Sequence, residues 1–259
     1  MPNLRYDFNN LMAERVGDHG ITEAELKALS LKLAAAALAL EQNPPAFRTL
    51  PHMATDRWSV INTPGRLSGA TAMNALCSKT GKLWENPALT GAAMLYLADK
   101  AKGKNIHLIL SYREEVRDLI EWYRYLLAES LGKRVCRTGK LAYCGQTPVS
   151  VSNPDTLMQL CIEGPYDKVT TFLTIGEPDP KQTAAEIALT KSGRPNFALR
   201  MGRWDEETMG AVMFLLEMQT AYAGELYGVS VFDQQGFELF QKQLKEQPPK
   251  PKPEFVVHS

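Results

Sequence analysis

The sequence has no long apolar run, no excess of charge and no paired cysteines, and each absence excludes a class of protein. No apolar segment reaches the ~18 residues that a bilayer-spanning helix needs, so we expect no membrane insertion. The 29 basic and 29 acidic side chains cancel, which favours neither nucleic acid nor an anionic membrane as a partner. Residues 1–10 are polar and lack the apolar core of a signal peptide. We therefore expect a cytoplasmic protein.

Patterns that bind metals are also scarce. The four cysteines form no Cys-x-x-Cys pair, and no histidine lies beside them at the spacing of metal ligands. Such isolated cysteines are typical of buried or half-buried free thiols. The four histidines are scattered, and His107 lies in the apolar run 106–110, where a strand residue is more common than a ligand. The sequence therefore predicts no metal site.

The apolar pattern in the middle of the chain predicts an α/β fold. Short apolar runs at 106–112, around Val149 and Val151, and at 169–175 predict strands, and the segments between them predict helices. Strand, helix, strand, helix, strand within ~70 residues is typical of a parallel sheet that is wrapped by helices. We expect a three-layer sandwich with a mostly parallel sheet.

Helices are also expected before and after this sheet. Thr22 and Glu25 form a capping box for a helix over 22–41. After Pro180 the pattern is helical. The remaining helices are expected at 68–76, 86–102, 205–228 and 236–247. The proline-rich residues 247–253 predict an extended tail.

The predicted elements divide the chain into three regions. Residues 1–50 are expected to form an N-terminal helical arm. Residues 51–246 are expected to form one α/β domain that includes the C-terminal helices. Residues 247–259 are expected to form an extended tail of prolines and lysines.

Five short motifs occur in order along the chain. They are Asp56-Arg57-Trp58-Ser59-Val60, Ala128-Glu129-Ser130-Leu131-Gly132-Lys133, Gly145-Gln146-Thr147-Pro148-Val149, Glu163-Gly164-Pro165-Tyr166-Asp167-Lys168-Val169 and Phe232-Asp233-Gln234-Gln235-Gly236-Phe237-Glu238-Leu239. In this order they resemble motifs of the glucose-6-phosphate isomerase family, and residues 4–42 resemble the N-terminal arm of its bacterial members. The resemblance implies the sugar-isomerase (SIS) fold, with helices on both faces of a mostly parallel sheet.

The resemblance also implies that most of one SIS domain is missing. Family members have two such sheets, and loops of the first sheet bind the sugar phosphate. Here the chain passes from the arm near Leu50 directly to Asp56. The segments 68–71 and 78–82 contain residue types that bind phosphate, but the first lies where the family has a helix and the second lacks the spacing of a phosphate loop. Both are weak candidates.

The resemblance assigns roles to three residues. Glu129 falls on the family's catalytic base, Arg57 on an arginine that stabilises the enediolate, and Gln234 on a glutamine that contacts substrate. Glu129 also lies in the last turn of its predicted helix, where the dipole disfavours a negative charge, as suits a general base. From the residues alone, structural roles also remain open. Glu129 would then be a helix-end glutamate neutralised by Lys133 or Arg134, Arg57 a surface arginine and Gln234 a turn residue.

Two other family positions carry changed residues. Asp155 falls on the family's histidine, and an aspartate cannot replace an imidazole that titrates near neutral pH. Gln241 falls on the family's catalytic lysine and cannot ionise. A shift of one residue would offer Lys242, but that shift turns a helical side chain by ~100°.

Three hypotheses follow. The first is an impaired isomerase that interconverts glucose 6-phosphate and fructose 6-phosphate through an enediol, without a cofactor. The second is a non-catalytic relative that binds a sugar phosphate or acts as a scaffold, or a decayed gene product. The third is that a separate polypeptide supplies the first half. In the family the active site borrows a histidine from a neighbouring subunit, so we expect a homodimer.

Overall fold

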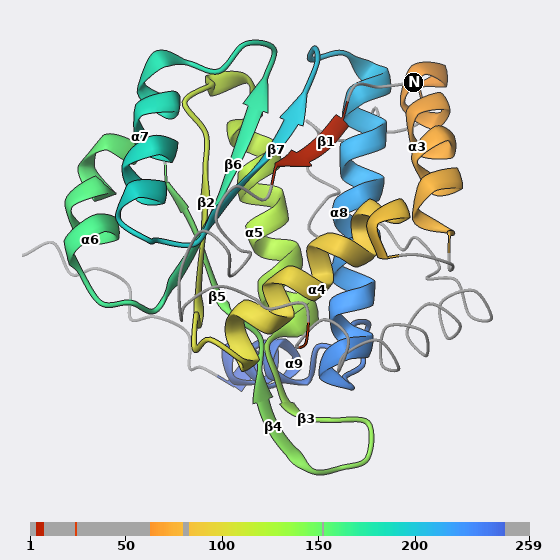
Figure 1. Ribbon diagram of the computed structural model, residues 1–259. Coiled ribbons are helices and arrows are strands. Elements are labelled where there is room, and N and C mark those ends of the chain that lie inside the picture. The colour runs from red at the N-terminus through yellow and green to blue at the C-terminus, as the bar shows by residue number, and fades with distance from the viewer. Residues whose placement is uncertain (1–3, 8–23, 25–62, 80–82, 152, 247–259) are drawn as a thin grey trace, which may run out of the picture.

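A mostly parallel sheet forms the centre of the structure. The computed structural model of the chain describes residues 4–7, 24, 63–79, 83–151 and 153–246. Within them, five strands form a sheet with the order β1-β7-β6-β2-β5 (Figure 1). The strands are β1 (Leu4–Asp7), β2 (Ile106–Leu110), β5 (Thr147–Val151), β6 (Lys168–Ile175) and β7 (Asn196–Met201). β5, β2, β6 and β7 run parallel, whereas β1 pairs antiparallel with β7. The predicted mostly parallel sheet is confirmed.

Helices lie on both sides of this sheet (Figure 1). One side carries α3 (Pro64–Cys77), α4 (Pro87–Lys100), α5 (Arg117–Leu131) and α8 (Glu206–Tyr227), and the other carries α6 (Met158–Glu163) and α7 (Pro180–Lys191). The side chains of β2 alternate between the two sides, as strand geometry requires. Ile109 joins the larger core with α4, α5 and α8, whereas Leu108 and Leu110 join the smaller core with α6 and α7. The predicted three-layer arrangement is confirmed.

Burial on both faces explains why the central strands have almost no polar alternation. In β6, every residue after Lys168 is buried, as is typical of parallel strands that helices cover on both sides. The prediction of helix alone after Pro180 is wrong, because β7 lies between α7 and α8, with only Arg200 less than fully buried. A short apolar run fits a buried strand or a helix equally well, and its periodicity does not separate the two.

The predicted ends of two helices are confirmed. Asn86 is the N-cap of α4, and its side chain accepts a hydrogen bond from the N–H of Leu89 at 2.9 Å. Asp205 is the N-cap of α8, and its carboxylate accepts from the N–H of Thr208 at 2.8 Å. Such side-chain acceptors satisfy N–H groups that have no partner within the first helical turn. α8 ends at Gly228, as predicted.

Two glycines allow α3 and α8 to pack with their backbones in contact. A Cβ atom on Gly69 would lie 1.8 Å from the carbonyl oxygen of Glu207, and one on Gly210 would lie 2.0 Å from that of Arg66. Gly69 belongs to the segment 68–71, which the sequence offered as a weak phosphate-binding candidate. That segment lies inside α3 and packs on α8, so it does not form a phosphate loop.

Two further elements extend beyond the sheet and its helices. The strands β3 (Lys133–Val135) and β4 (Leu141–Cys144) form a hairpin that was not predicted. The predicted final helix is confirmed as α9 (Gln235–Glu246), which has no buried residue. Its exposed side chains include Leu239, Phe240 and Leu244. The hairpin and α9 lie near the same end of α5 (Figure 1).

Several predictions fall outside the described residues. They concern nearly all of the helix over 22–41, residue Arg57 and the tail over 247–253. β1 lies within the range that was expected to be an N-terminal arm, and it pairs with the sheet. Across the described parts of the chain, every helix is too short or too polar to cross a bilayer.

Candidate active site

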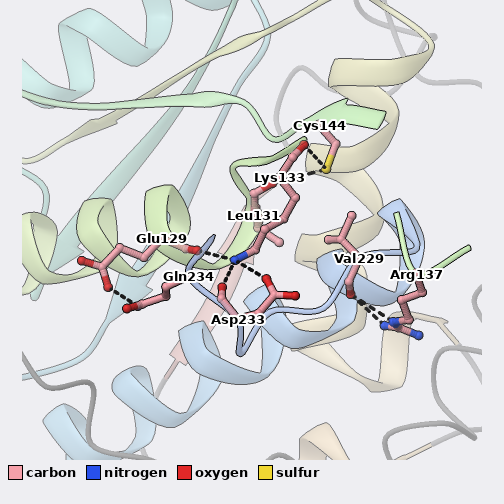
Figure 2. A network of polar contacts seen from close by, with 8 residues as sticks. All are labelled: Glu129, Leu131, Lys133, Arg137, Cys144, Val229, Asp233 and Gln234. Atoms are coloured by element: carbon pink, nitrogen blue, oxygen red, sulfur yellow. Dashed lines mark hydrogen bonds and ion pairs between the residues drawn. The ribbon is translucent and has the colours of Figure 1, made fainter. Parts of the chain in front are cut away.

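The structure brings together two of the three residues to which the sequence assigned roles. Glu129 lies in the last turn of α5, and Gln234 lies immediately before α9. The side-chain nitrogen Nε2 of Gln234 donates a hydrogen bond to Oε2 of Glu129 at 2.8 Å, across 105 positions of sequence (Figure 2). Both residues are half-buried. The third residue, Arg57, lies outside the described residues.

Lys133 fixes the end of α5 to the segment before α9 (Figure 2). Its Nζ donates to the main-chain carbonyl of Glu129 at 2.8 Å and to the main-chain carbonyl of Asp233, and it lies 3.2 Å from Oδ1 of Asp233. The Lys133 side chain is only 10% exposed. The sequence left open that Lys133 neutralises the Glu129 carboxylate. Instead, Lys133 donates to the main-chain carbonyl of Glu129, and the carboxylate accepts a hydrogen bond from Gln234.

The segment before α9 is also held from the β3–β4 hairpin. The guanidinium of Arg137 donates to the carbonyl of Val229 at 2.9 and 3.2 Å and to the carboxylate of Glu225 at 2.7 Å. The main-chain N–H of Arg137 donates to the carbonyl of Gly228. The hairpin therefore fixes the start of the segment, and Lys133 fixes its end next to Gln234 (Figure 2).

The motif that begins at Gly145 packs against the end of α5. Gly145 has φ of +95°, and a Cβ atom there would lie 2.7 Å from the carbonyl oxygen of Leu131. The preceding residue, Cys144, donates from Sγ to the same carbonyl at 3.3 Å. Only glycine tolerates this backbone conformation and this approach together. Three of the five sequence motifs therefore meet at the carboxyl end of α5.

This arrangement provides a carboxylate whose position is fixed. One oxygen of Glu129 is held by an amide donor, and the backbone on either side is tied by Lys133 and by the packing of Gly145. A carboxylate held in one geometry can accept a proton from a substrate carbon that is bound beside it. In the described ranges, no group of three or more His, Cys, Asp or Glu side chains could hold a metal ion.

Comparisons with known proteins find similarity between this chain and one group of enzymes. No protein-family model matches the chain. The chain is 32% identical over 209 residues to a glucose-6-phosphate isomerase of Carboxydothermus hydrogenoformans. The matched region covers 69% of this chain and 45% of that protein. It is 34% identical over 224 residues to that of Rubrobacter xylanophilus, covering 70% and 50%, and 32% identical over 235 residues to that of Methanocaldococcus jannaschii, covering 76% and 57%.

This chain is a relative of the glucose-6-phosphate isomerases. It spans about half the length of the curated relatives that it matches. A solved structure of a hypothetical protein from Thermus thermophilus has a TM-score of 0.60 and 27% identity, covering 70% of this chain and 49% of that one. A glucose-6-phosphate isomerase structure from Chlamydia trachomatis has a TM-score of 0.59 over 70% and 42% of the two chains, and at 17% identity it supports the fold alone.

Asp155, at the position where the glucose-6-phosphate isomerases have a histidine by sequence resemblance, does not join the Glu129 site. It lies in the first turn of the 3-10 helix η5 (Pro154–Leu157) and accepts from Nζ of Lys181 at 2.8 Å. The hydrogen bonds from Lys181 and Tyr112 hold the pKa of Asp155 below its ordinary value. Asp155 lines a crevice with Arg117, which begins α5, whereas Glu129 lies near the other end. That helix separates the two regions by ~18 Å.

Neither side chain considered for the isomerase family's lysine position contacts Glu129. Gln241 lies in α9 and is half-buried, and the alternative Lys242 is exposed. Lys242 lies 3.9 Å from the carboxylate of Glu246 on the outer side of α9. A shift of one residue in the alignment therefore offers a lysine that pairs with Glu246 of the same helix.

Sequence reasoning missed the residues that hold the site in place. Arg137 and Glu225 were not singled out, and Lys133 was considered only as a neutralising charge. Arg137 and Glu225 come from the hairpin and from the end of α8, and no local pattern joins them. The available signal was the position of Lys133 directly after the glycine that ends α5, where a cation complements the helix dipole.

Proposed function

We propose that this chain belongs to a sugar-phosphate isomerase and interconverts glucose 6-phosphate and fructose 6-phosphate, with Glu129 as the base. The observation that supports this most directly is the hydrogen bond from Gln234 to Glu129 at 2.8 Å. It joins two motifs that both resemble the isomerase family, and relatives at 32–34% identity carry that activity in their names.

The proposed reaction transfers one proton between neighbouring carbons. The Glu129 carboxylate takes the proton from C2 of the opened aldose, the C2–H electron pair forms the C1=C2 double bond of the enediol, and the π electrons of the C1 carbonyl move to O1, which takes up a proton. The proton on Glu129 then returns to C1, and O2 gives up its hydroxyl proton as the C2 carbonyl of the ketose forms. The amide of Gln234 orients the carboxylate through Oε2. Arg57 is the proposed cation for the enediolate, by resemblance alone. A fixed base contributes because it needs no reorganisation when the substrate arrives.

We also propose that this activity is impaired. The family's histidine position holds Asp155, whose pKa is lowered by its contacts with Lys181 and Tyr112, so this group stays ionised at neutral pH. The family's lysine position holds Gln241, whose amide cannot ionise and so cannot serve as a general acid. Loss of one general acid or base typically lowers a rate by ~10²–10⁴.

The test is a coupled assay with fructose 6-phosphate, glucose-6-phosphate dehydrogenase and NADP. We expect slow turnover that Glu129→Gln abolishes, because the amide keeps the shape of the side chain but cannot accept the proton. The matched control is Glu163→Gln, which alters an exposed glutamate at the end of α6 and should leave the rate unchanged. Turnover that persists in Glu129→Gln would exclude this residue as the base.

A second candidate function is sugar-phosphate binding without turnover, as a regulatory or scaffold subunit. It is favoured by the ion pair between Asp155 and Lys181. This pairing lowers the pKa of Asp155 and raises the pKa of Lys181, so both groups stay charged at the position where the family has an acid–base histidine. This function predicts that the wild-type chain shows no turnover at high protein concentration, yet that 6-phosphogluconate raises its melting temperature. Absence of any thermal shift at millimolar ligand would count against retained binding.

The remaining proposals concern assembly and organisation. We propose a homodimer, because α9 exposes Leu239, Phe240 and Leu244 on one helix and apolar side chains grouped in this way are typical of contact surfaces. We keep the division into residues 1–50, 51–246 and 247–259 and a cytoplasmic location as proposals. A monomer in size-exclusion chromatography at micromolar concentration would contradict the dimer.

A further inference from the structure

A polar crevice lies at the carboxyl ends of β2 and β5, away from the Glu129 site. Its volume is ≈ 390 Å³, which is large enough for a small metabolite. Its lining includes Ser111 after β2, Ser150 within β5, Arg117 at the start of α5, and Asp155 and Lys181 from the segments that follow. The crevice is separate from the proposed catalytic residues, because α5 places Arg117 and Glu129 ~18 Å apart.

The topology of the sheet explains why a crevice forms there. β2 leads into α5, which lies on one face of the sheet, and the neighbouring β5 leads through η5 into α6, which lies on the other face. The two connections diverge and leave a gap beyond the strand ends. In open α/β sheets, ligands bind in the crevice outside the carboxyl ends of the strands.

Three cationic side chains from separate segments line this crevice. They are Arg113 before η4 (Glu114–Val116), Arg117 in α5 and Lys181 in α7. Their side chains are 42%, 54% and 68% exposed, and each already lies near one carboxylate: Glu115 at 3.8 Å, Glu114 at 2.9 Å and Asp155 at 2.8 Å, respectively. Exposed ion pairs of this kind contribute little to stability, so each cation can exchange its partner for an anion on a ligand.

The lining also contains hydrogen-bond acceptors, which a bare anion would not satisfy. Glu114, Glu121 and Asp155 contribute carboxylates. Glu121 already accepts from Arg124 at 2.9 Å and from the hydroxyl of Ser150. A ligand that displaces the ion pairs of Glu114 and Asp155 must therefore supply donors to these carboxylates. Hydroxyl groups are such donors, and they tolerate partial exposure to water.

We propose that this crevice binds a small hydroxylated phosphate monoester, with its phosphate between Arg117 and Lys181 and its hydroxyls toward Asp155 and Glu114. This proposal is independent of isomerase activity, because none of these residues contacts Glu129 or Gln234 in the described structure. It adds a binding site at the amino end of α5 to the proposed catalytic site at the carboxyl end.

The test is isothermal titration of the full chain with glucose 6-phosphate, inorganic phosphate and glucose, in the Glu129→Gln background that prevents turnover. Glucose 6-phosphate should bind more tightly than either fragment. Lys181→Gln and Arg117→Gln should each weaken its binding by about tenfold, as expected for the loss of one charge-assisted hydrogen bond. The matched control is Lys191→Gln, an exposed lysine ~15 Å away on the same helix α7, which should leave binding unchanged.

Three results would overturn this proposal. One is the absence of binding at millimolar glucose 6-phosphate. Another is an affinity in Lys181→Gln and Arg117→Gln that stays within about twofold of the parent chain. The third is equal affinity for inorganic phosphate, which would remove the role of the hydroxyls. Because Arg117 and Lys181 do not contact Glu129, unchanged affinity in their variants overturns only this proposal and leaves the coupled assay free to succeed, and failure of that assay leaves binding at this crevice intact.

Discussion

The two ends of α5 are built in different ways. The carboxyl end is closed by contacts from distant segments: Lys133 reaches Asp233 across 100 positions, and Gln234 reaches Glu129 across 105 (Figure 2). The amino end is open, and its cations Arg117 and Lys181 are mostly exposed and paired with exposed carboxylates. One helix therefore joins a region of fixed geometry to a region whose side chains can exchange partners.

This difference matches what each end is proposed to do. A base must be held in one position before the substrate arrives, since misplacement by about 1 Å can cost ~10²-fold in rate. A binding crevice gains from exposed side chains, because their ion pairs are given up at little cost when a ligand enters. The comparison predicts that equivalent substitutions at the two ends have unequal effects on stability.

The largest effect is expected where Gly145 packs on α5. Gly145→Ala introduces a Cβ atom 2.7 Å from the carbonyl oxygen of Leu131, at φ of +95°. Both the backbone conformation and the clash oppose it, so we expect the free energy of unfolding to fall by about 3–4 kcal/mol. The control is Gly139→Ala in the β3–β4 turn, which has φ of +78° but no atom within 4 Å of the added Cβ.

Urea denaturation of both variants separates conformation from packing. Gly139→Ala carries only the conformational cost, about 1 kcal/mol. If both substitutions cost the same, the close contact at the end of α5 has no energetic role, and the contrast between the two ends is weakened.

The second effect compares two lysines. Lys133→Met removes the ammonium group that is shared by the Glu129 and Asp233 carbonyls and keeps most of the apolar stem. Because the Lys133 side chain is only 10% exposed, we expect a loss of about 2–3 kcal/mol in unfolding free energy. Lys181→Met breaks an ion pair of similar length, 2.8 Å, that is exposed, and we expect no measurable change. Equal losses in chemical denaturation would show that the two ends do not differ in this respect.

The elements that the sequence predicted are those with local signals. The parallel strands β2, β5 and β6 are short apolar runs between polar residues, and the helices α4 and α8 begin at capping residues. The β3–β4 hairpin was missed because Leu141 and Tyr143 are exposed, so its strands carry no apolar alternation. β7 was missed because an isolated buried run has no period to distinguish strand from helix.

The site shows the same division between local and distant information. Glu129 and Gln234 were singled out by resemblance, and their side chains form a hydrogen bond in the structure. Lys133 was found, but its partners were not, because both carbonyls lie on backbone whose path depends on the tertiary fold. The crevice at the amino end could not be predicted, because it depends on which face of the sheet each connection follows.

The smallest effect concerns α8, which packs along α5 between the two ends. Burial raises the pKa of Glu217 on α8 to about 7, from an ordinary 4.5. The folded state thus holds this proton more tightly than the unfolded state, so the stabilisation is complete below pH 4.5 and is lost as pH rises through 7. Because Glu217 is half-buried, we expect this loss to be about 2 kcal/mol. Glu217→Gln should remove it, so that urea midpoints of the variant and the wild type agree at pH 4 and differ at pH 8. An equal difference at both pH values would mean that Glu217 acts through packing, and the middle of α5 would then resemble its closed end.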